Sequence, residues 1–197
     1  MSVDYEINSR VAIVTGASSG MGLASAKELA QQGVNLILVS RSKEKLTQAK
    51  KEILALADVE IEVLSGNVIE KKLPLKAVEL AIAKWNKVDI LINNAGGPPM
   101  GSFLEHDDEV WDEVLEQNLK SVIRFTRAVI PMMIENKWGR IINITSTLAK
   151  EPTAAMVLSA TARAGVSAFS KSISSEVAEY GITVNTLCPG GVLTDRL

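Results

Sequence analysis

The sequence predicts a doubly wound α/β domain, in which helices cover both faces of a parallel sheet. Short runs rich in β-branched residues alternate with longer amphipathic segments along the whole chain, the pattern of repeated βα units with short connections. The short runs are mostly apolar throughout, as strands buried on both faces of a parallel sheet are. No linker, repeat or low-complexity stretch divides the 197 residues, so we expect a single domain over residues 1–197.

The expected elements alternate in type along the chain. Each strand is a run of four or five mostly apolar residues, and each helix carries apolar residues at three- and four-residue spacing. The strands are expected at residues 11–14 (Val-Ala-Ile-Val), 35–39 (Asn-Leu-Ile-Leu-Val), 61–64 (Ile-Glu-Val-Leu), 89–92 (Asp-Ile-Leu-Ile), 140–144 (Arg-Ile-Ile-Asn-Ile) and 183–187 (Thr-Val-Asn-Thr-Leu). The helices are expected at residues 21–32, 43–56, 74–85, 107–135 and 159–180.

Composition and charge exclude several classes of function. The formal net charge is −2, and no basic stripe or cationic amphipathic helix points to a nucleic acid or a membrane surface. No apolar run approaches the roughly 20 residues that span a bilayer, and the polar N-terminus lacks a signal-peptide pattern. One cysteine and one histidine allow no disulfide framework and no multi-ligand metal site. We therefore expect a cytoplasmic protein with no bound metal, no nucleic-acid partner and no membrane contact.

The strongest local signal is a glycine-rich turn between the first strand and the first helix. It reads Thr-Gly-Ala-Ser-Ser-Gly-Met-Gly from Thr15 to Gly22. Glycines at such a turn let the backbone approach a pyrophosphate closely, and the helix N-terminus that follows offers free N–H groups and a positive dipole. The turn therefore predicts a Rossmann-type dinucleotide site. Its expected phosphate-binding residues are Gly16, Ser18, Ser19, Gly20, Met21 and Gly22.

The end of the second strand discriminates between the two nicotinamide dinucleotides. An NAD site usually has Asp or Glu there to accept from the ribose 2′-hydroxyl, whereas the 2′-phosphate of NADP needs cations and hydroxyls. This chain has Ser40, Arg41 and Lys43, and arginine binds a phosphate through two parallel hydrogen bonds. We expect NADP(H), with NAD(H) as the alternative. Solvated charges at the start of a helix are the other interpretation of Arg41 and Lys43.

Five short motifs, taken in order, resemble those of the short-chain dehydrogenase/reductase family, which includes the 3-oxoacyl-acyl-carrier-protein reductases. They are the glycine turn, Asn93-Asn94-Ala95-Gly96, Asn118 within Gln-Asn-Leu-Lys, Ser146 after the fifth strand, and Pro189-Gly190 followed by Thr194. The match extends over essentially the whole chain. It implies an oxidoreductase that transfers hydride between the nicotinamide and a carbonyl or secondary alcohol.

The resemblance also implies roles for residues outside the glycine turn. Ser146 would hydrogen-bond the substrate carbonyl, and Asn118 would support an ordered water in a proton relay. The further cofactor contacts would be Asn67 and Val68 beside the adenine, Asn94, Ala95 and Gly96 under the nicotinamide ribose, and Pro189, Gly190 and Thr194 at the carboxamide.

The resemblance breaks at the catalytic pair. The family carries Tyr-x-x-x-Lys starting thirteen residues after the serine, and those positions hold Ser159 and Arg163 here. A tyrosine phenol, with an ordinary pKa near 10, becomes a usable acid when a lysine cation lowers that pKa. A serine hydroxyl is a far poorer acid or base, and an arginine keeps its proton at neutral pH. Arg163 would still supply a positive charge and a contact to the nicotinamide ribose, whereas the two tyrosines, Tyr5 and Tyr180, lie elsewhere in the sequence.

Three interpretations follow from this exchange. The favoured one is a reductase with a non-standard proton donor, either a water held by Ser146, Ser159 and Asn118 or a proton from the substrate. The second is a dinucleotide-binding sensor or regulatory subunit without catalysis. The third is a scaffold whose long helices, residues 107–135 and 159–180, pair with a second copy. In each case we expect a homodimer or homotetramer, and the retained glycines, asparagine and serine argue against a pure scaffold.

The end of the chain is a second departure from the family. Members normally continue past the position of Thr194 with a segment that covers the substrate and a seventh strand, and this sequence stops at Leu197. We therefore expect a domain that is incomplete at its C-terminus relative to the family, without the last strand. The substrate is expected to be a small carbonyl or alcohol whose identity the sequence does not reveal.

Overall fold

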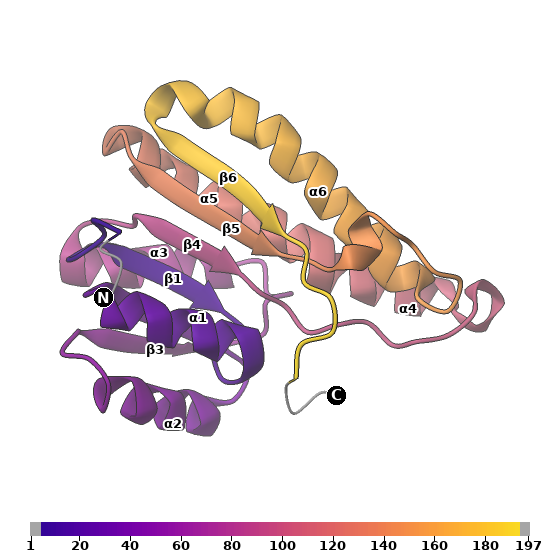
Figure 1. Cartoon of the computed structure of the whole chain (residues 1–197), viewed down its shortest axis with the longest axis horizontal. Helices are drawn as coiled ribbons and strands as arrows, with labels where there is room; N and C mark the ends of the chain where they lie inside the picture. The colour runs from indigo at the N-terminus through magenta and orange to yellow at the C-terminus, as the bar shows by residue number, and fades with distance from the viewer. Residues whose placement is uncertain (1–4, 194–197) are drawn as a thin grey trace.

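Six parallel strands form the sheet (Figure 1). The computed structural model describes residues 5–193. The spatial order is β3-β2-β1-β4-β5-β6, so the chain reverses its direction of travel across the sheet beside β1. The strands are β1 Val11–Thr15, β2 Asn35–Ser40, β3 Ile61–Ser65, β4 Ile90–Asn93, β5 Gly139–Ile144 and β6 Ile182–Leu187. The predicted doubly wound α/β class is confirmed.

Helices cover the two faces of the sheet in two groups. Helices α1 and α2 pack on one face, and α3, α5 and α6 pack on the other (Figure 1). The helices are α1 Gly20–Gln31, α2 Lys43–Leu54, α3 Leu73–Trp85, α4 Asp108–Leu115, α5 Ser121–Glu135 and α6 Val157–Val177. A π-helical turn, Glu116–Lys120, joins α4 to α5, and we call it the π segment. Short 3-10 turns lie at Phe103–Glu105, Thr147–Ala149 and Ala178–Tyr180.

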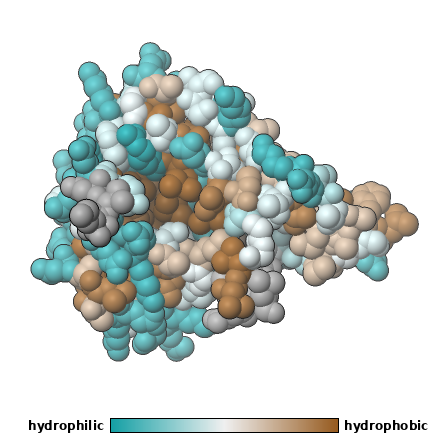
Figure 2. All heavy atoms as spheres, viewed as in Figure 1, coloured by the Kyte–Doolittle hydropathy of each residue, from teal (hydrophilic) through white to brown (hydrophobic). Residues whose placement is uncertain are grey.

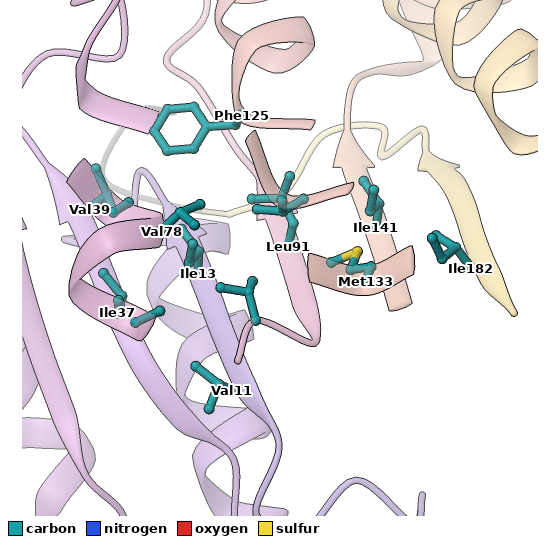
Figure 3. Packing of buried hydrophobic residues seen from close by; sticks show 14 of the residues in the cluster. Val11, Ile13, Ile37, Val39, Val78, Leu91, Phe125, Met133, Ile141 and Ile182 are labelled. Atoms are coloured by element: carbon teal, nitrogen blue, oxygen red, sulfur yellow. The ribbon is translucent and has the colours of Figure 1, made fainter. Parts of the chain in front are cut away.

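The core consists of two layers of apolar side chains, one on each face of the sheet. Successive residues of a strand point to opposite faces, so Val11 and Ile13 face α3 and α5 while Ala12 and Val14 face α1 and α2. Figure 3 shows the first of these layers. Its largest fully buried side chain is Phe125 of α5, only 1% exposed. Burial of both sets explains why the central strands lack an alternating polar pattern.

Apolar side chains also gather in two places on the face shown in Figure 2. One place is the middle of the view, where β5 and β6 face the viewer in Figure 1, and Leu187 at the end of β6 is 53% exposed. The other is the right-hand tip, formed by the segment between β4 and α4. There Met100, Phe103 and Leu104 are mostly exposed. The residues of the second place belong to neither layer of the core.

Three predicted helices differ from the observed ones by two residues or more, and the one predicted over residues 43–56 ends at Leu54. The π segment divides the helix predicted over residues 107–135, because one turn there holds an extra residue, which apolar spacing does not reveal. The helix predicted over residues 159–180 begins two residues earlier, at Val157, and ends in a 3-10 turn. Gly181 then adopts a left-handed conformation, with φ of 71°, which ends the element.

The fourth strand begins at Ile90 rather than at residue 89. Asp89 is buried, and its carboxylate accepts a hydrogen bond at 2.9 Å from the N–H of Val11 and another at 2.9 Å from the guanidinium of Arg10. The side chain therefore ties the starts of β1 and β4 together. A carboxylate with these two partners is satisfied although it is removed from water.

The Phe125→Ala substitution is expected to lower the free energy of unfolding by about 3–5 kcal/mol, because it removes a large side chain from a closed layer and leaves a cavity. The matched control is Phe103→Ala, since that ring is 63% exposed. Urea unfolding followed by circular dichroism measures both variants. Equal losses of stability in the two variants would contradict the assigned core.

Candidate cofactor and active site

The glycine turn brings the end of β1 very close to the start of α1. Gly16 has φ of 61° and Gly20 has φ of 53°, both in the left-handed region that glycine adopts readily. A Cβ added to Gly22 would overlap the carbonyl oxygen of Gly16, and a Cβ added to Gly16 would lie 2.5 Å from the carbonyl oxygen of Asn94. The backbone can therefore take this path only with glycine at these positions.

The start of α1 leaves polar groups available at the turn. Ser19 is the N-cap residue, with extended backbone, and its side chain makes no capping hydrogen bond. Ser18 precedes it, and Gly20 and Met21 form the first turn of the helix. The N–H groups of a first turn have no partner within the helix. Hydroxyls and N–H groups together can therefore bind a phosphate, with the helix dipole favouring the negative charge.

Asn94 joins the end of β4 to the glycine turn. Its backbone N–H donates to the Thr15 hydroxyl at 2.9 Å, and its side-chain amide donates to the carbonyl oxygen of Gly16 at 3.4 Å. Ala95 and Gly96 follow it along the edge of a cavity that lies at this end of the sheet. The chain reverses its direction across the sheet at this point, between β1 and β4, where open α/β sheets bind their ligands.

Cationic and hydroxyl side chains gather at the end of β2. Ser40 is buried, and its hydroxyl has no hydrogen-bond partner among the described residues. Arg41 and Lys45 are exposed and line the cavity. The Ser42 hydroxyl accepts from the Lys45 N–H at 3.2 Å and caps α2. Two cations, a helix N-terminus and an unpartnered hydroxyl suit a dianionic phosphate.

The loop after β3 forms the wall of the cavity that lies opposite α1. The Gly66 N–H donates to the carbonyl oxygen of Ser40 at 3.0 Å, which brings the loop beside β2. The Asn67 N–H donates to a carboxylate oxygen of Glu70 at 2.7 Å, and the Asn67 side-chain oxygen accepts from the Ile69 N–H at 3.4 Å. Asn67 and its neighbour Val68 thus occupy a compact turn at the cavity edge, beside the glycine turn in space but far from it in sequence.

These segments enclose one cavity of about 520 Å³, a volume in the range of small-molecule and cofactor sites. The glycine cradle, the cations and the unpartnered Ser40 hydroxyl all fit a dinucleotide phosphate. The lining residues predicted from the sequence are Gly16, Ser18, Ser19, Gly20, Met21, Ser40, Arg41, Asn67, Val68, Asn94, Ala95 and Gly96. The lining residues that sequence reasoning missed are Ser42, Lys45, Gly66 and Gln117.

Lys45 rather than Lys43 lines the cavity. Both lie in the first turn of α2, but residues two positions apart are about 200° apart around a helix axis and so lie on nearly opposite sides. Which of the two sides faces the cavity depends on how α2 packs against the sheet, so the sequence alone does not single out Lys45. No sequence signal identified Gln117, because its position depends on the π segment.

The predicted substrate-binding serine lies on a turn beside the end of β6. The Ser146 hydroxyl oxygen accepts from the Leu148 N–H at 3.3 Å, which leaves its proton available to donate. The Thr147 N–H donates to the carbonyl oxygen of Pro189 at 3.0 Å, so Pro189 and the exposed Gly190 lie beside this turn. Thr194 lies outside the described residues.

The exchanged pair, Ser159 and Arg163, is internally hydrogen-bonded. The Arg163 Nε donates to the Ser159 hydroxyl oxygen at 3.2 Å, and Nη1 donates to the carbonyl oxygen of Ile144 at 3.2 Å. Ser159 is 3% exposed and does not line the cavity. Arg163 therefore connects the start of α6 to the end of β5, two residues before Ser146.

Asn118 lies in the π segment and is buried. Its amide group donates to the carbonyl oxygen of Val114 at 3.3 Å, while its oxygen Oδ1 has no partner among the described residues. The next residue, Leu119, packs closely on Gly165 of α6. The π segment thus presents a buried acceptor near the helix that carries Ser159 and Arg163. A water that donates to Oδ1 would satisfy it.

The fold and the cavity together define a dinucleotide-binding protein of the Rossmann type. Comparison with known protein families shows that residues 10–197 match the family described as short chain dehydrogenase. The chain belongs to the short-chain dehydrogenase/reductase family, as the motifs predicted, and is an oxidoreductase of that family. One curated relative, the 3-oxoacyl-acyl-carrier-protein reductase FabG of Escherichia coli strain K12, is 38% identical over 186 residues, which cover 94% of this chain and 75% of the relative.

Solved structures of reductases share the fold along the length of the chain. An actinorhodin polyketide ketoreductase with NADPH matches with a TM-score of 0.91 and 36% identity, covering 100% of this chain and 74% of that one. The L-sorbose reductase of Gluconobacter frateurii, in complex with NADPH and L-sorbose, matches with a TM-score of 0.95 and 30% identity, covering 98% and 74%. Within the described residues of this chain, no helix is both long and apolar enough to cross a membrane.

The Gly22→Ala substitution is expected to lower the free energy of unfolding by about 1–3 kcal/mol, the usual cost of forcing extra volume into a packed site. The added methyl group would meet the backbone of Gly16, which has no room to move away. Gly191→Ala is the control, because a Cβ there meets nothing within 4 Å. Thermal and urea unfolding measure both variants. Unchanged stability of Gly22→Ala would contradict the close approach of β1 and α1.

Proposed function

We propose that this chain is an NADP(H)-dependent reductase that interconverts a carbonyl and a secondary alcohol. The observation that carries the cofactor assignment is the group of Ser40, Arg41 and Lys45 at the start of α2, inside the cavity. The NADPH bound to the two solved relatives supports it. The ribose 2′-phosphate would lie against this group, and the diphosphate would lie against the glycine turn.

The remaining cofactor residues are assigned the roles that the family resemblance implies. Asn67 and Val68 would contact the adenine, because their loop forms the wall opposite α1. Asn94, Ala95 and Gly96 would support the nicotinamide ribose. The residues at the carboxamide would be Pro189, Gly190 and Thr194.

The chemistry of the proposed reaction is divided between the cofactor and the chain. The bound nicotinamide supplies or accepts the hydride. The Ser146 hydroxyl donates a hydrogen bond to the substrate carbonyl oxygen and holds it in place, since its own oxygen already accepts from the Leu148 N–H. Preorganised donors of this kind stabilise negative charge that develops on oxygen.

The proton for the product oxygen would come from a water rather than from a tyrosine. The unpartnered Asn118 oxygen is the acceptor that would hold this water, together with the hydroxyls of Ser146 and Ser159. Arg163 would keep a positive charge beside them, as its hydrogen bond to Ser159 supports. This arrangement lacks an acid of matched pKa, so we expect modest turnover compared with a tyrosine-lysine site.

The proposed partner is a small carbonyl or alcohol substrate, in keeping with the reductases that the chain resembles. We also propose one domain over residues 1–197, a cytoplasmic location, and a homodimer or homotetramer that pairs the long helices.

The Arg41→Asp substitution is expected to raise the Kd for NADPH roughly tenfold or more and to leave the Kd for NADH nearly unchanged. Loss of a charge-assisted hydrogen bond costs about 1.5–3 kcal/mol, and 1.4 kcal/mol corresponds to tenfold. Fluorescence titration of the full chain measures both constants, and Arg127→Asp on the exposed face of α5 controls for charge. Absence of saturable NADPH binding by the unaltered chain would overturn the proposed function, and an unchanged preference in Arg41→Asp would overturn the 2′-phosphate assignment.

The double substitution Ser159→Tyr with Arg163→Lys is expected to raise turnover about 100-fold or more, the usual contribution of a positioned general acid. Steady-state oxidation of NADPH with a panel of ketones and 3-oxoacyl thioesters measures this, and Ser159→Tyr alone is the control because it lacks the lysine. Circular dichroism checks that the buried position accepts the larger side chain. A folded double variant without any gain would contradict a limiting proton donor.

A further inference from the structure

We propose that Glu116 and Arg124 are positioning residues that hold the loop after β3 against the cofactor. This inference rests on the proposed binding of NADP(H). Neither residue lines the cavity, and neither belongs to the motifs that carry the family resemblance. Their effect on the cofactor would pass through Ile69, which directly follows Val68 in the wall of the cavity.

The contacts form a short chain from the π segment to the loop. Glu116, the first residue of the π segment, pairs with Arg124 of α5, with 2.6 Å between its Oε2 and Nη2 of the arginine. Nη1 of Arg124 donates to the carbonyl oxygen of Ile69 at 3.4 Å, across 55 positions of sequence. The Arg124 side chain is 17% exposed, whereas its hydrogen bond to Ile69 is open to solvent.

The loop needs a second point of attachment. The hydrogen bond from the Gly66 N–H to Ser40 fixes its start. The hydrogen bonds from the N–H groups of Asn67 and Ile69 have their acceptors within the loop, so they define the conformation of the loop but not its position relative to the sheet. Ile69 itself is 37% exposed and is not held by burial. Val68 packs against the core layer that faces α3 and α5. At the next residue, the guanidinium of Arg124 adds a polar attachment from α5, which we infer helps to set the position of Asn67 and Val68.

The next residue of the π segment, Gln117, contacts the loop after β4 on the other side of the cavity. The side-chain amide of Gln117 donates to the carbonyl oxygen of Gly96 at 3.3 Å and lines the cavity. The extra residue in a π turn rotates neighbouring side chains relative to a regular helix. Glu116 and Gln117 can therefore serve two different loops from adjacent positions. The π segment, which also carries Asn118, is thus linked to both walls of the cofactor cavity.

Charge supports a positioning role rather than direct phosphate binding. Glu116 also pairs with Lys120 at 2.8 Å, and this hydrogen bond, more than the one from Arg124, lowers the pKa of Glu116 below its ordinary value against the opposing effect of partial burial. The carboxylate is charged at neutral pH and balances Arg124. The charge of Arg124 is balanced by Glu116 and lies outside the cavity, so we infer that Arg124 acts on the cofactor through its hydrogen bond to the Ile69 carbonyl and not through its own charge.

The experiment compares Glu116→Gln and Arg124→Gln with Lys120→Gln in the full chain. Lys120 pairs with the same carboxylate but makes no contact with Ile69, so it is the matched control. The probes are NADPH and adenosine 2′,5′-bisphosphate, which carries the adenine and the 2′-phosphate without the nicotinamide. We expect Kd for both probes to rise about three- to tenfold in Glu116→Gln and Arg124→Gln, the effect of one or two hydrogen bonds. Lys120→Gln is expected to bind both probes as the unaltered chain does.

Two further measurements separate positioning from general loss of structure. Hydrogen exchange is expected to accelerate at residues 66–70 in Glu116→Gln, with the rates of β1 and β5 unchanged. Arg124→Lys is expected to recover part of the affinity, because an ammonium group can still donate. If Arg124→Gln fails to fold, the nearly isosteric Glu116→Gln decides the question.

The outcomes for this inference and for the proposed function are distinguishable. If the unaltered chain binds both probes and Glu116→Gln matches Lys120→Gln in affinity and exchange, the positioning role is wrong and the cofactor assignment stands. If the unaltered chain binds neither probe, the proposed function is wrong. A faster exchange throughout the sheet of Glu116→Gln would also overturn the inference, since it would indicate a structural role only.

Discussion

All six strands run in one direction, so every connection returns through a helix or a long loop, and the carboxyl ends of the strands meet at one edge of the sheet. The glycine turn, the end of β2, the loop after β3, Asn94 and Ser146 all follow strands at this edge. Residues 79 positions apart, such as Thr15 and Asn94, become neighbours for this reason. The cofactor cavity is a consequence of strand direction combined with the close approach that Gly16 and Gly22 allow between β1, α1 and β4.

The two halves of the site depend on this edge in different ways. The phosphate half is built largely from backbone, including a helix N-terminus and two left-handed glycines, so its geometry needs few particular side chains. The catalytic half depends on side chains, and here two of them are exchanged. Ser159 and Arg163 nevertheless keep a defined arrangement, with hydrogen bonds to each other and to Ile144. The exchange therefore leaves the frame of the site in place, and under the proposed function it would alter only the acid-base chemistry.

The π segment connects these halves. A regular helix over residues 107–135 would present different side chains toward the sheet edge, whereas the observed turn places Glu116, Gln117 and Asn118 toward three separate partners. The unpartnered oxygen of Asn118 is a cost that a buried site tolerates only when water or a ligand satisfies it. Local irregularity in the helix thus coincides with the place where cofactor walls and catalytic residues come together.

The sequence by itself determined the βα alternation, the glycine turn, the hydroxyl and cation at Ser40 and Arg41 on which the proposed 2′-phosphate site rests, and the exchange at positions 159 and 163. Each of these depends on spacing along one segment, which local backbone geometry converts directly into structure. Only the tertiary structure decided that Lys45 rather than Lys43 faces the cavity, that Gln117 lines it, and that Ser159 is buried. These facts depend on how α2 packs against the sheet, on one extra residue in a helical turn, and on how α6 packs against the sheet. No pattern within a single segment contains that information, because it arises when distant segments exclude water from one another.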